Sequence, residues 1–249
     1  MVHAAFDAGI NFFFLTADMH WPLYEPVRSG LTDLIRRGRG MRDDIVVAAC
    51  CYVTQPEFCY TPFEEVLEAV PGLKRIDVLV AGGAYADELG RRLPVFLEHR
   101  DQGFVGTGAV GASFHDIVAA RRSIIAEETD VAFVRYNPGH RGAAIDLFPY
   151  LSRPRGTVVY NFNSTHGHVN EWQWRSLGLE DYWQPGITDY YRFALSEPQL
   201  DGILCAPESE PELGALIDAL EKGPLTHGER EHLAHLADLS RGNVALRRR

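Results

Sequence analysis

Side chains that can do acid–base chemistry occur in short groups along this chain, and each group lies at the end of an apolar run. Asp18 and His20 follow the first run, and Cys50 lies at the end of the second. His140 follows the fifth, and the segment Asn161–His168 (NFNSTHGH) closes the sixth. An imidazole titrates near neutral pH and transfers protons without help from neighbouring charges. These groups predict general acid–base catalysis, with candidate catalytic residues His20, Asp18, Cys50, His140, Asn163 and His166.

One pair of histidines also has the chemistry of a metal site. His166 and His168 are separated by a single glycine, so both rings can point to the same side of a loop. A catalytic Zn²⁺ or Fe²⁺ site uses three protein ligands, and His140, His20 or a cysteine can supply the third. The alternative, which we favour, is that both are loop histidines that bind no metal.

The four cysteines, Cys50, Cys51, Cys59 and Cys205, are too few for a disulfide scaffold in a chain of 249 residues, and they form no CxxC pair. We expect reduced thiols and a cytoplasmic protein. Adjacent residues of a strand point to opposite faces, so only one of Cys50 and Cys51 can face a shared site. That thiol is either a nucleophile working with His20 or a small buried apolar filler.

The apolar runs that position these residues alternate with longer amphipathic stretches, which is typical of βα units around a parallel sheet. We predict strands at Asn11–Leu15, Ile45–Cys51, Ile76–Val80, Phe104–Val110, Val131–Tyr136, Thr157–Phe162 and Gly202–Cys205. Helical spacing predicts helices near Val27–Arg37, Phe63–Val70, Ala86–Arg100, Phe114–Ala126, Gly142–Leu151, Asp189–Ser196 and Glu210–Lys222. The pattern favours an α/β protein with a (β/α)8 TIM-type barrel, in which polar residues after the strands form the active site.

The predicted barrel lacks its first strand, because His3–Ala8 has the pattern of the helix that should follow it. Two sheet edges would be exposed, so we expect a partner chain, a loop or a swapped segment to cover them, which includes the option of a homo-oligomer. We assign residues 1–241 to a single barrel and residues 242–249 to a frayed tail. The aromatic-rich segment His166–Gly186 follows the sixth predicted strand, and we expect it to form a lid over the active face.

Composition excludes several classes of function. The net charge of −10 gives no positive field to attract nucleic acid or anionic lipid. No apolar run reaches the roughly 18 residues that a membrane span requires, and the first ten residues lack the pattern of a signal peptide. We therefore expect a cytoplasmic protein of small-molecule metabolism, or of biosynthesis, that binds neither nucleic acid nor membrane.

Several stretches, in the same order along the chain, resemble the aldo-keto reductase superfamily. AGINFFFLTADMH is similar to that family's "aGinfFDTAdmYG" signature, and DDIVVAAC resembles the strand that follows it. RIDVLVAGG resembles "yiDlyqlH", and GAVGAS resembles "aiGvS". The segments RYNPGHRGAAIDLFP and YYRFALSEPQLDGILCAPESEPELGALIDALEKGPL are similar to the later strands and closing helix of bacterial members. The resemblance runs from about Ala5 to Leu239 and implies the same barrel.

The resemblance also implies that the family's catalytic tetrad is degenerate here. Reduction in the family uses a tyrosine as proton donor, tuned by a lysine and an aspartate, and a histidine that orients the carbonyl. The matching positions hold His20 for the tyrosine, Leu15 for the aspartate, Cys50 for the lysine and Gly82 for the histidine. Of these replacements, only His20 is a ready acid or base at neutral pH.

Cofactor binding, by the same resemblance, is weakened. The family binds the adenosine phosphate of NADPH on the loop after the last strand, and the matching segment CAPESEPEL carries Glu208 and Glu210, which repel a phosphate. We therefore expect no cofactor. Should NAD(P)H bind, the resemblance implies that Ser113 and Asn137 contact the nicotinamide.

Three functions remain open. The first, which we favour, is an enzyme that acts on a small molecule by non-redox acid–base chemistry of the lyase, cyclase or isomerase type. The second is an NAD(P)H-dependent aldo-keto reductase acting on a small carbonyl compound. The third is a catalytically inactive binding protein. Because this fold hosts many reactions, the resemblance of the fold does not choose among them.

Overall fold

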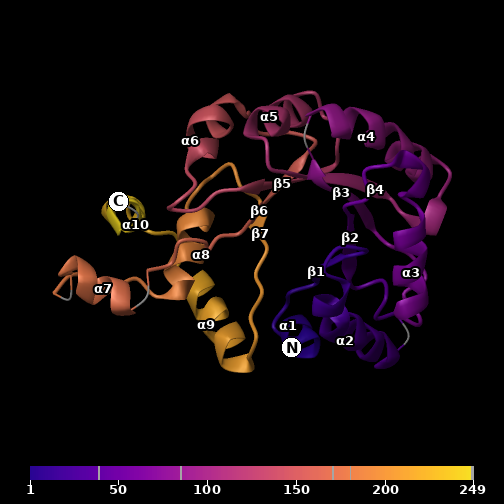
Figure 1. The fold of residues 1–249 in the computed structure, drawn as a ribbon. Helices are drawn as coiled ribbons and strands as arrows, with labels where there is room; N and C mark the ends of the chain where they lie inside the picture. The colour runs from indigo at the N-terminus through magenta and orange to yellow at the C-terminus, as the bar shows by residue number, and fades with distance from the viewer. Residues whose placement is uncertain (39, 85, 170, 180, 248–249) are drawn as a thin grey trace.

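The computed structural model describes residues 1–38, 40–84, 86–169, 171–179 and 181–247. Within this part of the chain, seven parallel strands form one sheet in the order β1-β2-β3-β4-β5-β6-β7. Figure 1 shows that the sheet curls into an open half-barrel with the helices on its outside. The strands are β1 (Phe12–Thr16), β2 (Val46–Cys51), β3 (Val78–Ala84), β4 (Ala109–Phe114), β5 (Val131–Arg135), β6 (Val158–Phe162) and β7 (Gly202–Ile203). The predicted TIM-type architecture without one strand is confirmed.

Helices α2 to α8 lie in the connections between successive strands, because parallel pairing requires a crossover between neighbouring strands. The described helices are α1 (Val2–Asp7), α2 (Glu25–Arg36), α3 (Thr61–Ala69), α4 (Ala86–Asp101), α5 (Ile117–Ile125), α6 (Gly142–Asp146), α7 (Glu171–Leu177), α8 (Ile187–Leu195), α9 (Glu210–Glu221) and α10 (His227–Arg247). Short 3-10 turns are η1 (Trp21–Tyr24), η2 (Pro56–Phe58), η3 (Phe104–Gly106) and η4 (Phe148–Tyr150). Among the described residues, no helix combines the length and apolar character needed to cross a membrane.

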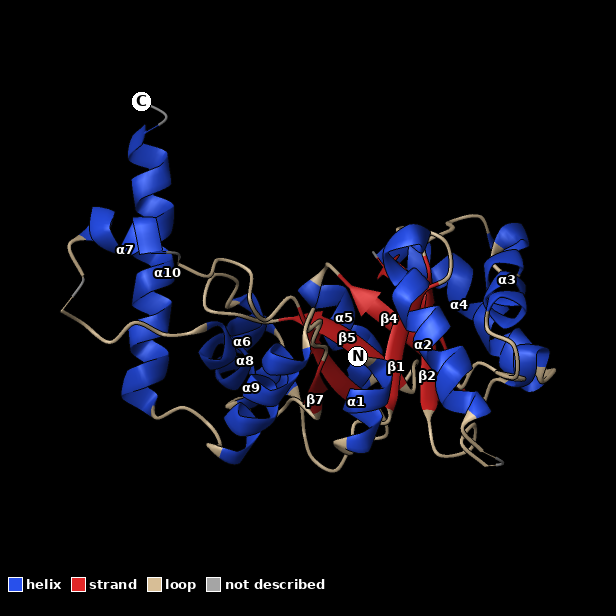
Figure 2. Cartoon of the chain, turned by 90° about the horizontal axis from the view of Figure 1, so that it is seen from below, coloured by secondary structure: helices blue, strands red, loops and turns tan. Residues whose placement is uncertain are grey.

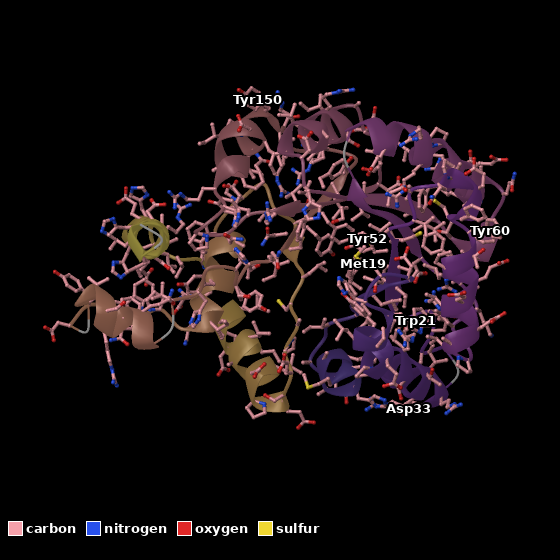
Figure 3. All side chains as sticks on the ribbon, viewed as in Figure 1. Met19, Trp21, Asp33, Tyr52, Tyr60 and Tyr150 are labelled. Carbon is pink, nitrogen blue, oxygen red and sulfur yellow. The ribbon has the colours of Figure 1, made fainter. Side chains whose placement is uncertain are left out.

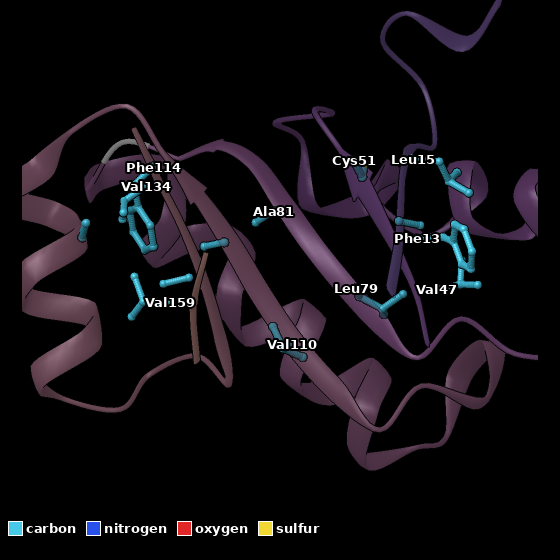
Figure 4. Close-up of a cluster of buried hydrophobic side chains, with 14 of the residues drawn as sticks. Phe13, Leu15, Val47, Cys51, Leu79, Ala81, Val110, Phe114, Val134 and Val159 are labelled. Carbon is cyan, nitrogen blue, oxygen red and sulfur yellow. The ribbon is translucent and has the colours of Figure 1, made fainter. Parts of the chain in front are cut away.

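The alternation of side chains along each strand separates an outer core from an inner one. The outer core packs the helices onto the sheet and includes Leu15, Cys51, Leu79 and Val134, part of which Figure 4 shows. The inner core consists mainly of residues from the strands, with Cys50, Val80 and Phe133 among its buried members. Each strand is therefore apolar on both faces, which explains why the sequence shows nearly continuous hydrophobic runs.

Aromatic rings fill the interior of the half-barrel on both sides of its opening. Phe12 of the first strand stacks on Tyr160 of the sixth with ring centroids 4.8 Å apart. Phe133 lies 5.7 Å from Tyr160 and 5.3 Å from Phe14. Side-chain packing thus joins the first strand to the last part of the sheet without backbone pairing between them.

The end of the sheet opposite to the polar groups is tied by a repeated aspartate. Asp77, Asp130 and Asp201 each directly precede a strand, and each carboxylate accepts the backbone N–H of a residue in the strand before it. The three distances, to Val47, Val110 and Val159 in turn, are 2.7 to 2.8 Å. This repeated geometry at the amino-terminal end of the strands stabilises the barrel and leaves the other end for chemistry.

Three details differ from the sequence prediction. The fourth strand begins at Ala109, not at Phe104, because Gly103, Val105 and Gly106 have φ of 67°, 44° and 67° and form a turn that breaks the apolar run. The segment predicted as a lid instead forms α7, which packs on α10 beside the barrel through Val169, Trp174 and Leu236 (Figure 2). Finally, β7 ends at Ile203, before the predicted end of that strand at Cys205.

Candidate active site

The carboxyl ends of the seven strands meet at one end of the half-barrel, which we call the mouth. The last inward-facing residues with described side chains on β1 to β6 are Thr16, Cys50, Gly82, Ser113, Arg135 and Phe162. Leu15 faces the helices instead and is completely buried in the outer core. Of the positions matched to the reductase tetrad, Cys50 and Gly82 therefore face the interior, and Leu15 does not.

Asp18 holds the backbone of the mouth in place. Its Oδ2 atom accepts hydrogen bonds from the backbone N–H groups of Tyr52 (2.7 Å) and Val53 (2.9 Å), and from the thiol of Cys51 at 3.4 Å. Its Oδ1 atom accepts the N–H of Met19 at 2.6 Å. Asp18 thus ties the loop after β1 to the loop after β2, and no described hydrogen bond joins it to His20.

Tyr52 occupies the space that the missing side chain of Gly82 leaves. A Cβ atom on Gly82 would lie 2.9 Å from two carbons of the Tyr52 ring and 2.6 Å from Sγ of Cys50. In Figure 3 Tyr52 lies at the inner side of the sheet. Burial raises the pKa of the Tyr52 phenol, and the neighbouring Cys50 raises it further, so the phenol stays protonated at neutral pH and acts as a hydrogen-bond donor.

Cys50 is a buried, protonated thiol. Burial raises its pKa to about 12, against a hydrogen bond with Tyr52 that lowers it. A thiol needs its thiolate form to act as a nucleophile, and this one is neutral throughout the physiological range. The geometry favours the apolar-filler interpretation of Cys50 over the nucleophile.

His20 lies at the mouth on a left-handed turn. Its φ is 62°, its side chain is exposed, and its carbonyl accepts the N–H of Leu23 at 2.9 Å, which starts η1. The described contacts include no hydrogen bond from its ring to Asp18 or Asn163. The imidazole is therefore presented to solvent beside the segment that Asp18 anchors, where a substrate can reach it.

Two buried asparagines, Asn137 after β5 and Asn161 within β6, form hydrogen bonds within the protein itself. Asn137 is fully buried, and its amide donates to the carbonyl of Asn163 (2.8 Å) and accepts the N–H of Gly139 (3.0 Å). Asn161 is equally buried, accepts the N–H of Tyr136 (2.6 Å) and donates to Ser164 (2.7 Å). Part of the hydrogen-bonding capacity of Asn137 is therefore used within the protein.

The three histidines His140, His166 and His168 of the predicted site do not lie together. His140 and His166 lie side by side with ring centroids 4.9 Å apart, and Nδ1 of His140 is 3.2 Å from Oδ1 of Asn137. His168 instead packs edge-on against Tyr190 at 5.1 Å, and burial lowers its pKa. Within the described part of the chain, no three His, Cys, Asp or Glu side chains are placed to hold a metal ion.

Arg135 and His115 form a second polar group at the mouth. Arg135 is the last residue of β5 and is partly exposed on the inner face. The ring of His115 packs edge-on against Phe162 at 5.7 Å, and its pKa is lowered by burial and then by the charge of Arg135. By contrast Arg141, in the loop after β5, forms an ion pair with Asp238 of α10 at 2.8 Å.

The loop after β7 is filled by its own acidic side chains. Ser209 caps α9 by accepting the N–H of Glu212 at 3.4 Å, and the carboxylate of Glu212 accepts the N–H of Glu208 at 2.9 Å. Two backbone donors at this helix start, the N–H groups of Glu208 and Glu212, are therefore already partnered, next to negative charge.

Ser113 is the remaining residue predicted to contact a cofactor. It faces the interior at the end of β4 and is 7% exposed, and the described hydrogen bonds do not include its hydroxyl.

Two hollows elsewhere, one between α4 and α5 and one beside α2, involve none of the inward-facing residues of the mouth.

Sequence reasoning missed the buried arginine of α4. Arg92 is completely buried in α4, where its guanidinium donates to the carbonyl oxygens of Gly82 (2.9 Å) and Cys51. The signal was present in the helical spacing, because Arg92 occupies the apolar face formed by Leu89, Leu93 and Phe96. A charged residue on the core face of a helix predicts a buried polar contact.

Comparison with solved structures identifies the architecture. An aldo-keto reductase from Bacillus halodurans in its holo form superposes with a TM-score of 0.71 over 94% of this chain and 84% of that one, at 16% identity. A thermostable aldo-keto reductase in complex with the inhibitor epalrestat gives 0.69 over 94% and 85%, at 17% identity. A putative aldo-keto reductase from Pseudomonas aeruginosa gives 0.66 over 89% and 78%, at 17% identity. No protein-family model and no curated protein matches the chain. The chain therefore has the fold of the aldo-keto reductases.

Proposed function

We propose that the mouth of the half-barrel is the active site of an enzyme that moves protons on a small carboxylate-bearing carbonyl compound without using a nicotinamide. The observation that supports this best is the composition of the mouth. It combines an arginine, two histidines and a neutral phenol in Arg135, His20, His115 and Tyr52, in a fold whose chemistry lies at this end of the strands. Reactions of this kind include isomerisation, lyase-type elimination and cyclisation.

Each of these residues has a role that follows from its chemistry. The guanidinium of Arg135 can bind a carboxylate through paired hydrogen bonds. The phenol of Tyr52 is protonated at pH 7, as a phenol ordinarily is, and its raised pKa keeps it protonated at higher pH; it can therefore donate a hydrogen bond to a carbonyl oxygen and stabilise negative charge there. His20 is the acid or base that transfers the proton, and His115 is a neutral imidazole at pH 7 because its pKa is lowered.

The other predicted catalytic residues have supporting roles in this proposal. Asp18 positions Tyr52 through the loop that it anchors, and Cys50 packs beneath the same ring. His140, His166 and Asn163 form the opposite wall of the mouth, where the two histidine rings contact each other. We propose no metal at His166 and His168, because their rings make separate contacts.

A direct test measures proton transfer and needs no knowledge of the natural substrate. Small 2-oxo and 3-oxo acids are incubated with the protein in D₂O, and loss of the signal from the hydrogens beside the carbonyl is followed by ¹H NMR. We expect catalysed exchange for at least one acid. His20→Gln should slow it by about a hundredfold, as is typical for loss of a general base. Arg135→Gln should raise the half-saturating concentration, whereas Arg122→Gln, on the outer face of α5, should change nothing. Equal exchange in wild type and His20→Gln would contradict the proposal.

The second candidate is a nicotinamide-dependent reductase, and the presence of Tyr52 near the tetrad positions favours it. Its phenol is the correct kind of proton donor, although no lysine accompanies it. Titration of NADPH and NADH, followed by their fluorescence, separates the two candidates. We expect no saturable binding in the micromolar range. Saturable binding would favour the reductase, and the absence of both exchange and binding would favour an inactive binding protein.

A further inference from the structure

The backbone pairing of β2 and β3 ends before β3 itself does, and a buried arginine bridges the two strands at that point. Their last backbone pair joins Cys51 and Ala81, both labelled in Figure 4, although β3 continues to Ala84. Beyond this pair, Nη1 of Arg92 donates to the carbonyl of Gly82 at 2.9 Å, and Nη2 donates to the carbonyl of Cys51. The guanidinium thus takes the place of the backbone ladder where the two strands stop pairing.

Both carbonyls belong to the backbone that sets the position of Tyr52. Cys51 directly precedes Tyr52, so a bond to its carbonyl fixes the peptide from which the Tyr52 side chain extends. Gly82 and Gly83 form a surface against which the ring packs, since a Cβ atom on them would lie 2.9 Å and 3.5 Å from Cδ1 of Tyr52. Arg92 therefore holds the backbone that carries the ring and part of the backbone that supports it.

The peptide between Cys51 and Tyr52 lies between two opposite charges. The C=O and N–H groups of a trans peptide point in opposite directions within one plane. The Tyr52 N–H donates to the carboxylate of Asp18 at 2.7 Å, and the Cys51 carbonyl accepts from Arg92. Hydrogen bonds in series polarise one another, so the anion and the cation each strengthen the bond that the other makes. Loss of Arg92 should therefore also loosen the contact with Asp18.

Stability alone does not account for an arginine at this position. The side chain of Arg92 is completely buried, and its Nε atom has no hydrogen-bond partner in the described part of the chain. A buried donor that stays unpaired costs free energy of folding. The planar guanidinium does have the geometry to donate to two carbonyls at once, which is what two separating strands require.

The opposite end of the same two strands has a matching arginine. Arg42 is 6% exposed and donates to the carbonyls of Ile45, just before β2, at 3.0 Å and of Arg75, before β3, at 2.7 Å. It also pairs with the carboxylate of Asp77 at 2.7 Å. Arg42 thus bridges β2 and β3 at their amino-terminal ends, away from the mouth, and serves as the control for a purely structural role.

We propose that Arg92 is a positioning residue for Tyr52, which holds the ring in place through the Cys51–Tyr52 peptide and through Gly82. This role rests on the proposed function, in which the phenol of Tyr52 donates to the carbonyl oxygen of the substrate. Because Arg92 is completely buried, it acts only through this backbone and does not touch the substrate.

The position of Tyr52 can be measured without a substrate. The full chain is labelled with 3-fluorotyrosine, and the ¹⁹F signal of Tyr52, one of ten tyrosines, is assigned by its absence in Tyr52→Phe. Arg92→Gln removes the charge and can keep only one of the two bonds, so we expect the Tyr52 signal to shift and broaden. Arg92→Lys keeps the charge and should change the signal less. Arg42→Gln should leave it unchanged, and circular dichroism verifies the fold of each variant.

Three results of this measurement would overturn the proposal. The first is an unchanged Tyr52 signal in a folded Arg92 variant, and the second is an equal change of that signal in Arg42→Gln. The third is a loss of the fold in both Arg92→Gln and Arg92→Lys, because Arg92 would then be needed for the fold itself.

Hydrogen exchange of the small oxo acids in D₂O gives the second test. Arg92→Gln should lower the maximal rate by about tenfold, because a slightly displaced donor stabilises the developing charge less well. The half-saturating concentration should stay the same, since Arg135 binds the carboxylate. In a Tyr52→Phe background the substitution should have no further effect, whereas in an Arg135→Gln background it should keep its full effect.

The outcomes separate this inference from the function on which it rests. Equal effects of Arg92→Gln in the two backgrounds would contradict a role through Tyr52. An absence of exchange in the wild-type protein would contradict the proposed function instead, and the ¹⁹F signal would still show whether Arg92 positions the ring.

Discussion

The two sides of the mouth use polar side chains in opposite ways. On the side of β5 and β6, the amides of Asn137 and Asn161 are fully buried and bonded to the backbone or to Ser164. On the side of β1 and β2, one carboxylate, Asp18, ties the two loops together, and His20 and Tyr52 remain accessible. Both sides carry many polar residues. On the side of β5 and β6 most of them hold the backbone in place, whereas on the side of β1 and β2 several can contact a substrate.

The difference shows why residue type and position after a strand do not by themselves define an active site. A buried amide must satisfy its donors and acceptors inside the protein, and a turn offers the nearest partners. The carboxylate of Asp18 instead accepts the backbone N–H groups of a whole loop, at Tyr52 and Val53. The neighbouring side chains of His20 and Tyr52 are then not needed to hold the loop, and they can take part in a reaction.

The largest effect should come from breaking the scaffold side. Asn161→Ala removes the acceptor of the buried Tyr136 N–H and the donor to Ser164, and we expect a loss of about 3 kcal/mol in the free energy of unfolding. Asn163→Gly is the matched control, because the Asn163 side chain is exposed and its φ of 60° suits glycine. Chemical denaturation measures both. A loss for Asn161→Ala no larger than for the control would mean that this side is not a scaffold.

The fold could be predicted from the sequence because it depends on patterns that repeat. Strands buried on both faces give continuous apolar runs, and these located all seven strands, with the fourth displaced by the turn at Gly103–Gly106. The segment that carries Trp174 and Trp183 could not be placed in the same way. Its partner is α10, which lies far along the chain, and no local pattern indicates a contact of that kind.

The site could be predicted only in outline, because direction and partner are tertiary properties. The sequence placed polar residues at the mouth, but it could not show that Asn137 would be consumed by its own turn, or that Leu15 would face the helices. It also could not show that Gly82 would make room for Tyr52. Each of these depends on a residue more than twenty positions away in the chain or on a neighbouring strand.

A second prediction tests the packing on the accessible side. In Gly82→Ala the new methyl would lie 2.6 Å from the sulfur of Cys50 and 2.9 Å from the Tyr52 ring, so the ring must move. We expect a loss of about 2 kcal/mol in unfolding free energy, typical of overpacking a core. Gly90→Ala in α4 meets no atom within 4 Å and should stabilise the helix instead.

The double variant Cys50→Ala with Gly82→Ala sharpens this result. It removes the closest contact, so part of the lost stability should return if Cys50 acts as a filler. Denaturant titration of the single and double variants gives the coupling between the two positions. Additive losses would show that Cys50 and Gly82 do not share this space.

A third prediction concerns the anchor itself. Asp18→Asn keeps the shape but removes the charge that strengthens the bonds from the N–H groups of Tyr52 and Val53, and we expect a loss of about 1.5 kcal/mol. Asp33→Asn, whose side chain is 59% exposed on α2, is the control and should be nearly neutral. Thermal unfolding at one pH compares them. If both variants unfold alike, Asp18 does not organise the mouth.

The smallest effect should appear as a pH dependence on the scaffold side. Burial lowers the pKa of His168 below its ordinary value of 6.5, so the unfolded chain binds a proton at this ring more readily than the folded chain does. The free energy of unfolding should therefore fall as the pH decreases through about 6.5, and be unaffected by this group at higher pH. His168→Phe keeps the edge-on contact with Tyr190 but cannot titrate, and it should weaken this dependence. Denaturation at a series of pH values measures the slope, with the exposed His235→Gln as the control. His168 packs within the side of β5 and β6, whereas His20 is exposed to solvent on the side of β1 and β2. If the pH dependence of the unfolding free energy remained in His168→Phe but disappeared in His20→Gln, the scaffold would lie on the side of β1 and β2 instead.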